Sequence, residues 1–121
     1  MHSLGIKVGQ EKAKVFRLAS VVLNPGLVGL HVLDALTAGL PIVSTRQARH
    51  SPEVAYVKDG TNGVLTDDSA EAYASQVIKL LIDAPFREMI AANARQDGHR
   101  YTVDRMAQNF VSGIEACLAL A

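Results

Sequence analysis

The chain has 121 residues, of which 49% are hydrophobic and 20% are charged, as in a single globular domain. Its twelve basic and twelve acidic residues cancel, which excludes a global field attracting nucleic acid or an anionic membrane. The single cysteine, Cys117, excludes an internal disulfide, and no apolar run reaches the roughly 20 residues that span a bilayer. We expect a cytoplasmic protein without a signal peptide, either free or attached peripherally to a membrane.

The first predicted elements are a short strand, a helix and a buried strand. Residues 5–9 favour a short strand, and residues 11–19 favour a helix with Ala13, Phe16 and Leu18 directed inward. The nearly continuous apolar run over residues 20–23 is typical of a buried parallel strand.

A glycine-bearing turn, containing Gly26 and Gly29, leads into the next predicted helix, residues 29–38. A helix that begins there presents free N–H groups and the positive end of its dipole, a site suited to a diphosphate. The same turn can equally serve packing alone. Asp34 would reach the sugar of a nucleotide held there. The predicted packed face of this helix consists of Leu30, Leu33 and Leu36 or Thr37, with His31, Asp34 and Ala35 on another face.

Gly39 is the expected end of that helix, and a strand follows at residues 42–45. After a polar loop, Pro52 begins a helical turn that ends at residues 59–60, and residues 64–65 favour a short strand. Three helices follow: residues 70–82, a helix from Pro85 to near Gly98, and a last helix with an apolar stripe from Val103 to Cys117. We expect the Cys117 thiol to be packed against the core.

The alternation of strands and helices predicts an α/β fold: a partial Rossmann-like parallel sheet flanked by helices on both faces, forming one domain over residues 1–121. Only three or four strands are found, whereas a complete nucleotide-binding domain of this kind has about six. We therefore expect a domain that is incomplete at its N-terminal side.

Several motifs stand in the order and spacing of one known family. They are Gly29-Leu30, Leu-Asp-Ala-Leu at 33–36, Gly-Leu-Pro-Ile-Val at 39–43, Pro-Glu-Val at 52–54 and Asp-Gly-Thr-Asn-Gly-Val-Leu at 59–65. Together they resemble the C-terminal domain of family-4 retaining glycosyltransferases (glycosyl transferases group 1, GT-B fold). The resemblance runs from about residue 9 to about residue 113. It implies the later part of a domain that binds a nucleotide-diphosphate sugar, without the acceptor-binding domain.

The resemblance also implies roles for individual residues. The family signature has two glutamates eight positions apart, and Asp34 stands at the second, which holds the ribose hydroxyls. Gly26 stands at the first, which contacts the donor sugar, so the resemblance assigns no catalytic residue here. A Pro-Gly-x-Val-Gly-Leu form resembles variants found among polysaccharide-assembly enzymes. The implied ligands of the donor nucleotide-sugar are Gly26, Val28, Gly29, Leu30 and Asp34.

Further polar residues would lie around the donor or on the acceptor side: His31, Arg46, His50 and Glu53, with Arg49 nearby. Each also has a structural interpretation, as a helix-surface histidine, a solvated loop or the cap of a local turn. The four histidines are scattered and no Asp-x-Asp pair occurs, so we expect no metal site and no cofactor besides the sugar-nucleotide substrate.

Three functions remain open. The first is a glycosyltransferase piece whose transfer to a saccharide or other acceptor needs the N-terminal domain or a separate chain, so that this chain alone transfers little or no sugar. The second is a non-catalytic α/β module that pairs with a partner supplying the missing strands. The third is another GT-B enzyme, such as a nucleotide-sugar epimerase. The motifs at 33–36 and 59–65 favour the transferase.

Overall fold

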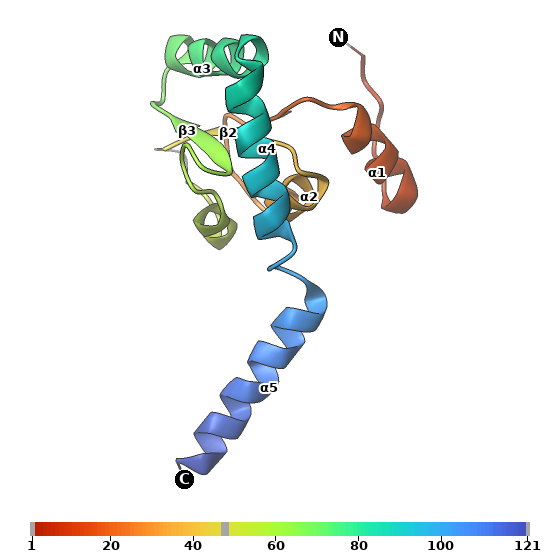
Figure 1. Ribbon diagram of the computed structural model, residues 1–121, viewed down its shortest axis with the longest axis vertical. Coiled ribbons are helices and arrows are strands. Elements are labelled where there is room, and N and C mark those ends of the chain that lie inside the picture. Colours follow the sequence, from red (N-terminus) through yellow and green to blue (C-terminus); the bar gives the residue numbers. More distant parts are fainter. Residues whose placement is uncertain (1, 47–48, 121) are drawn as a thin grey trace.

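The computed structural model describes residues 2–46 and 49–120, and its centre is a sheet of three parallel strands in the order β1-β2-β3 (Figure 1). They are β1 (Val22–Leu23), β2 (Ile42–Thr45) and β3 (Gly63–Thr66). Val22 lies opposite Ile42, which lies opposite Gly63. The predicted parallel α/β arrangement is confirmed.

The helices follow the predicted order. They are α1 (Gly9–Leu18), α2 (His31–Ala38), the 3-10 helix η1 (Pro52–Tyr56), α3 (Ala70–Ile82), α4 (Ala84–Gly98) and α5 (Val103–Ala119). Local signals set several ends: the Ser69 side chain caps α3 by accepting from the Ala72 N–H, and Gly39 ends α2 with φ of 67°. The predicted bounds of β2 and α3 are confirmed to the residue.

Two hydrophobic clusters lie on the two faces of the sheet, because neighbouring residues of β2 point to opposite sides. Ile42 belongs to the cluster formed with α2, and Val43 to the cluster formed with α3. Helix α4 contributes to both, with Ile90 in the second and Ala94 in the first. Between these two residues, the Asn93 side chain donates to the Thr61 carbonyl, just before β3. Helix α4 therefore passes from one face of the sheet to the other near the start of β3.

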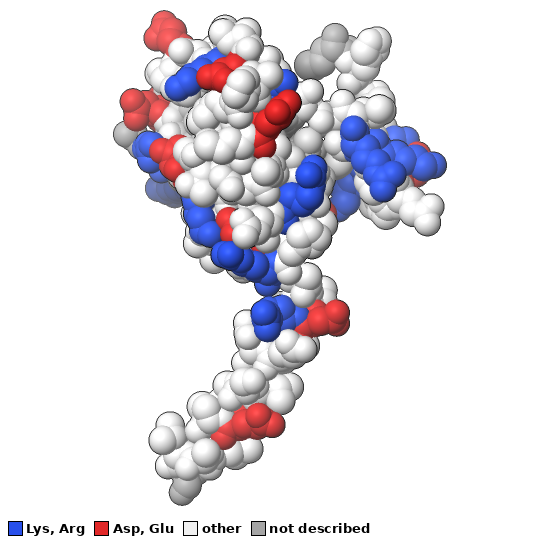
Figure 2. All heavy atoms as spheres, viewed as in Figure 1, with Lys and Arg blue, Asp and Glu red and all other residues white. Residues whose placement is uncertain are grey.

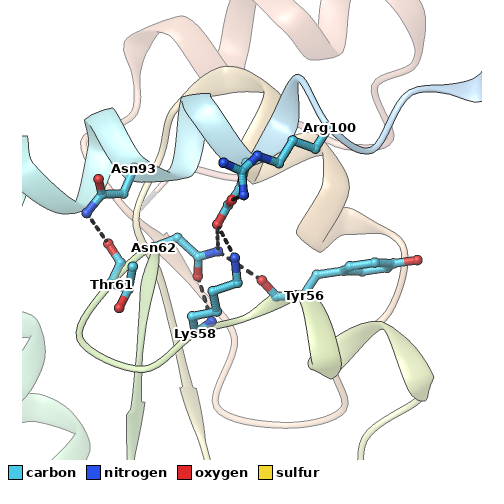
Figure 3. Close-up of polar contacts among 7 residues, drawn as sticks. Tyr56, Lys58, Thr61, Asn62, Asn93 and Arg100 are labelled. Carbon is cyan, nitrogen blue, oxygen red and sulfur yellow. Dashed lines mark hydrogen bonds and ion pairs between the residues drawn. The ribbon is translucent and has the colours of Figure 1, made fainter. Parts of the chain in front are cut away.

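A polar cluster fixes the turn that leads into β3 (Figure 3). The buried Asp97 carboxylate of α4 accepts hydrogen bonds from Lys58 Nζ at 3.0 Å and Asn62 Nδ2 at 2.8 Å, and Arg100 Nη1 lies 3.4 Å away. The Asn62 side chain also donates to the Tyr56 carbonyl and accepts from the Lys58 N–H. The Lys58 hydrogen bond is the main reason that the pKa of Asp97 is lowered. The Asn of the motif at 59–65 therefore has a structural role.

The N-terminal expectations are only partly correct. The strand expected at residues 5–9 is absent: Gly5 and Gly9 take left-handed backbone conformations, with φ of 65° and 53°, which interrupt an extended segment. Phe16 of α1 packs against the core as predicted, but Ala13 and Leu18 are exposed. Helix α1 therefore has a narrower packed face than its sequence indicates.

The packed face predicted for α2 is also wrong in part. The buried residues are Val32, Ala35 and Leu36, continued in the preceding turn by Val28, whereas Leu30 is 69% exposed. The helix begins at His31, two residues later than predicted, so Leu30 lies outside the regular helix. Positions 28, 32, 35 and 36 share one face at helical spacing.

Helix α5 departs most from expectation. It extends away from the rest of the molecule, and none of its residues is buried (Figure 1). Cys117 is exposed, so the prediction of a packed thiol is wrong. Figure 2 shows few charged side chains along this helix. The apolar stripe exists, but within the described residues nothing covers it. No helix in the described part of the chain is long and apolar enough to cross a membrane.

Candidate functional site

The turn between β1 and α2 begins with Asn24, at the carboxyl end of β1, where α/β sheets place their ligands. Its side-chain oxygen accepts from the Gly26 N–H at 3.0 Å, and its amide nitrogen donates to the Leu27 carbonyl at 2.9 Å. The same nitrogen lies 2.7 Å from His31 Nε2. The Asn24 side chain thus fixes the conformation of the turn through hydrogen bonds to its main chain and to His31. The sequence prediction missed it, although Asn is a common turn residue.

The second half of the turn is fixed by the loop after β2. The Val28 N–H donates to His50 Nδ1 at 3.2 Å, and His50 Nε2 lies 2.6 Å from the Thr45 carbonyl. The Val28 carbonyl accepts from the Ser51 N–H at 3.2 Å and from the Ser51 hydroxyl. Val28 itself is fully buried.

These contacts separate the four predicted main-chain ligands into two whose amides are already hydrogen-bonded within the described residues and two whose amides are not. The amides of Gly26 and Val28 have internal acceptors, in Asn24 and His50. The amides of Gly29 and Leu30 have no hydrogen-bond partner among the residues the structure describes. Their carbonyls accept the first bonds of α2, from Val32 and Leu33. The turn therefore offers two adjacent free donors at the positive end of the α2 dipole.

Asp34 lies on another side of α2, facing α1. Lys12 Nζ is 2.9 Å from each carboxylate oxygen of Asp34, and the Asp34 side chain is 38% exposed. It borders a cavity of about 630 Å³ between α1 and α2 whose lining includes Phe16, Arg17 and Tyr101 but neither Gly29 nor Leu30. The predicted phosphate and ribose ligands thus lie on the same helix but do not share one enclosed pocket.

The other predicted site residues separate into two groups. His31 and His50 bond to the turn, and Glu53 lies next to it through Ser51. The neighbouring Ser51 side chain is the main cause that lowers the pKa of Glu53, and Glu53 Oε2 is buried without a hydrogen-bond partner among the described residues. Arg46 instead pairs with Asp59, and Arg49 is exposed.

No three His, Cys, Asp or Glu side chains within residues 2–46 and 49–120 come together as a group that could hold a metal ion. The turn itself presents main-chain donors at the positive end of a helix dipole, and two histidines hold the loop in place.

The family model described as glycosyl transferases group 1 matches residues 2–83. The chain belongs to this family. A D-inositol 3-phosphate glycosyltransferase of Stackebrandtia nassauensis is 33% identical over 109 residues, which cover 87% of this chain and 24% of that protein. Sucrose-phosphate synthase 4 of Arabidopsis thaliana is 31% identical over 115 residues, which cover 88% of this chain and 11% of that protein.

Solved structures confirm the GT-B type of fold for this group 1 glycosyltransferase chain. A sucrose-phosphate synthase of Thermosynechococcus elongatus superposes with a TM-score of 0.76 at 18% identity, over 95% of this chain and 30% of that one. The structure of Anabaena Alr3699/HepE in complex with UDP superposes with a TM-score of 0.69 at 20% identity, over 85% of this chain and 29% of that one. The chain thus spans between about a tenth and a quarter of these two relatives, and about three tenths of each of these two solved chains.

Proposed function

We propose that this group 1 glycosyltransferase domain binds the diphosphate of a nucleotide-sugar at the N-terminus of α2, for transfer of the sugar to a saccharide or other acceptor. The amides of Gly29 and Leu30 would donate to phosphate oxygens, and the Asp34 carboxylate would accept from the ribose hydroxyls. The nucleotide would span from the turn to the side of α2 that faces α1.

The observation that carries this proposal is the pair of amides of Gly29 and Leu30, which have no partner in the described residues and lie at the start of α2 next to the internally bonded amides of Gly26 and Val28. Membership of the family supports the assignment of these donors to a sugar nucleotide, since the matched residues 2–83 include the whole turn and α2. The likeness in fold to HepE, solved with UDP and with UDP-glucose, agrees with a nucleoside diphosphate as ligand.

In the transfer itself, this part of the enzyme would act on the leaving group. Negative charge develops on the diphosphate as the bond to the sugar breaks, and fixed N–H donors with the helix dipole stabilise that charge. The acceptor would be held by another part of the enzyme, which would also exclude water and align the two substrates. We expect the 121-residue chain alone to bind donor but to transfer little sugar, and to need no metal.

The test is calorimetric titration of the chain with UDP, GDP, ADP and pyrophosphate, each with and without EDTA. We expect saturable binding of one nucleoside diphosphate that EDTA does not change. Leu30→Pro is the decisive variant, because Leu30 has φ of −55°, a value proline adopts, and its substitution deletes one free N–H. Leu30→Ala keeps that N–H and is the matched control.

A several-fold loss of affinity in Leu30→Pro, with Leu30→Ala unchanged, would support the main-chain phosphate site. A folded chain that binds none of the four compounds would refute the proposal. Equal affinity of the two variants would exclude the Leu30 amide as a ligand.

A second candidate function, a module completed by a partner chain, is favoured by the outer edge of β1. In the described residues this strand pairs only with β2, and its Leu23 is 51% exposed. Light scattering across a concentration series tests whether the chain associates. A constant monomer mass would count against this candidate.

A further inference from the structure

Two consecutive peptide groups of the turn are held at nearly every polar atom. In the first, between residues 27 and 28, the Leu27 carbonyl accepts from the Asn24 side chain and the Val28 N–H donates to His50. In the second, between residues 28 and 29, the Val28 carbonyl accepts from both donors of Ser51. Of these four main-chain groups, only the Gly29 N–H is without a partner in the described part of the chain.

We propose that His50 and Ser51 are positioning residues that aim the Gly29 amide at the donor phosphate. The inference rests on the proposed function and adds the residues that prepare its site. A trans peptide group is planar, with its carbonyl and N–H pointing in opposite directions. Because Ser51 holds the Val28 carbonyl on one side, the Gly29 N–H points away from Ser51.

His50 fixes the other end of Val28 and ties it to the sheet. Since the Val28 N–H donates to Nδ1, that nitrogen carries no proton, and the proton on Nε2 is donated to the Thr45 carbonyl at 2.6 Å. Thr45 is the last residue of β2, and its hydroxyl donates to the Pro25 carbonyl in the same turn. The imidazole of His50 therefore connects the end of a buried strand to the turn.

The consequence for binding is a prepared site. An unrestrained Val28–Gly29 peptide can flip, and a flipped peptide would present a carbonyl oxygen to the phosphate in place of an N–H. Ordering such a peptide would cost free energy when the ligand binds. Holding the peptide in one orientation beforehand removes this cost from the binding step. Loss of one such hydrogen bond, worth about 1 kcal/mol, corresponds to a roughly fivefold weaker affinity.

The experiment measures affinity for UDP, GDP and ADP in the full chain and in four variants. Ser51→Ala removes the hydroxyl, and His50→Ala removes both ring contacts. His50→Asn offers an oxygen near the position of Nδ1, whereas His50→Gln offers a donor near that of Nε2. The controls are His99→Ala and Ser112→Ala, at exposed positions away from the turn.

We expect His50→Ala and Ser51→Ala to bind the nucleotide about fivefold or more weakly, at temperatures well below their melting transitions. We expect His50→Asn to recover part of the affinity, because it restores an acceptor for the Val28 N–H. A merely structural role would lower the melting temperature of these variants without lowering affinity in the folded chain.

The outcomes separate this inference from the proposed function. If the unaltered chain binds nucleotide and the alanine variants bind it equally well, the positioning role is refuted and the proposed function stands. If the unaltered chain is folded and binds none, both are refuted. Nitrogen-15 spectra of the unaltered chain give an independent check, because a proton on His50 Nδ1 would also overturn the inference even if a variant fails to fold.

Discussion

Lys12 and Asp34 join α1 to α2 through a two-point contact, with Nζ at 2.9 Å from both carboxylate oxygens. Both side chains are about 40% exposed (41% and 38%), so the pair contributes little to stability. The pair matters for binding, because Asp34 is the proposed ribose ligand and its carboxylate is already bonded to the Lys12 ammonium. Each carboxylate oxygen has a second lone pair, so a ribose hydroxyl can be accepted beside the ammonium.

We predict that Asp34→Ala weakens nucleoside diphosphate binding by roughly tenfold or more, because hydrogen bonds to a charged acceptor are lost. Asp34→Glu should retain binding, since it keeps the carboxylate. Lys12→Met is the matched control, and it should lower the free energy of unfolding by less than about 1 kcal/mol. If calorimetry finds Lys12→Met as weak a binder as Asp34→Ala, the ion pair and not a ribose contact explains the loss.

Acid should destabilise the domain through Asp97. Its pKa is lowered in the folded state, so its contribution to stability is complete above the ordinary aspartate pKa of about 3.9 and is lost as pH falls through the folded value. We predict that the free energy of unfolding falls less steeply below about pH 5 in Asp97→Asn than in the unaltered chain. Urea titrations at several pH values measure this, with the exposed Asp104→Asn as control.

At neutral pH, Asp97→Asn should cost about 1–3 kcal/mol, because a charged acceptor is replaced in a buried cluster. Identical acid slopes for Asp97→Asn and the unaltered chain would show that another group controls acid unfolding.

Two glycines offer a matched test of packing. A Cβ at Gly98 would lie 2.7 Å from the carbonyl carbon of Leu36, in main chain that cannot move aside. We predict that Gly98→Ala lowers the free energy of unfolding by about 1–3 kcal/mol. Gly113→Ala, with nothing within 4 Å of the new Cβ, should leave that free energy unchanged and raise the helicity of α5. Equal stabilities by denaturant titration would contradict the close approach of α4 to α2.

Helix α5 should be dispensable for the stability of the rest. None of its residues is buried, so ending the chain after Thr102 removes no core contact. We predict a melting temperature within a few degrees of the full chain, with circular dichroism reporting the lost helix. As the contrasting variant, Ile90→Ala should cost about 2–5 kcal/mol, since Ile90 is fully buried. A large fall in melting temperature after truncation would mean that α5 packs against the body.

The elements that sequence predicts best here are those whose ends have local chemical causes. Helix α3 begins after the side-chain cap at Ser69, and α2 ends at Gly39 in the left-handed conformation. Both causes lie within a few residues of the element they limit, so they are visible in a linear reading.

The errors arise where contacts distant in sequence decide the outcome. An apolar stripe predicts which face of α5 would pack but contains no information on what packs there. In the candidate site, the motif positions of Gly29 and Asp34 are visible in the sequence. The hydrogen bonds that fix Val28 are not visible in the sequence, because their partners His50 and Ser51 lie 22 and 23 positions away from it.

The passage of α4 from one face of the sheet to the other has a consequence for how the molecule unfolds. Ile90 and Ala94, one helical turn apart, anchor the same helix in both hydrophobic clusters. Neither layer can open without disturbing this helix, so the two clusters should melt together as one cooperative unit. The amide protons in the middle of α4 would then exchange with solvent only through global opening, whereas those of α5 would exchange by fraying.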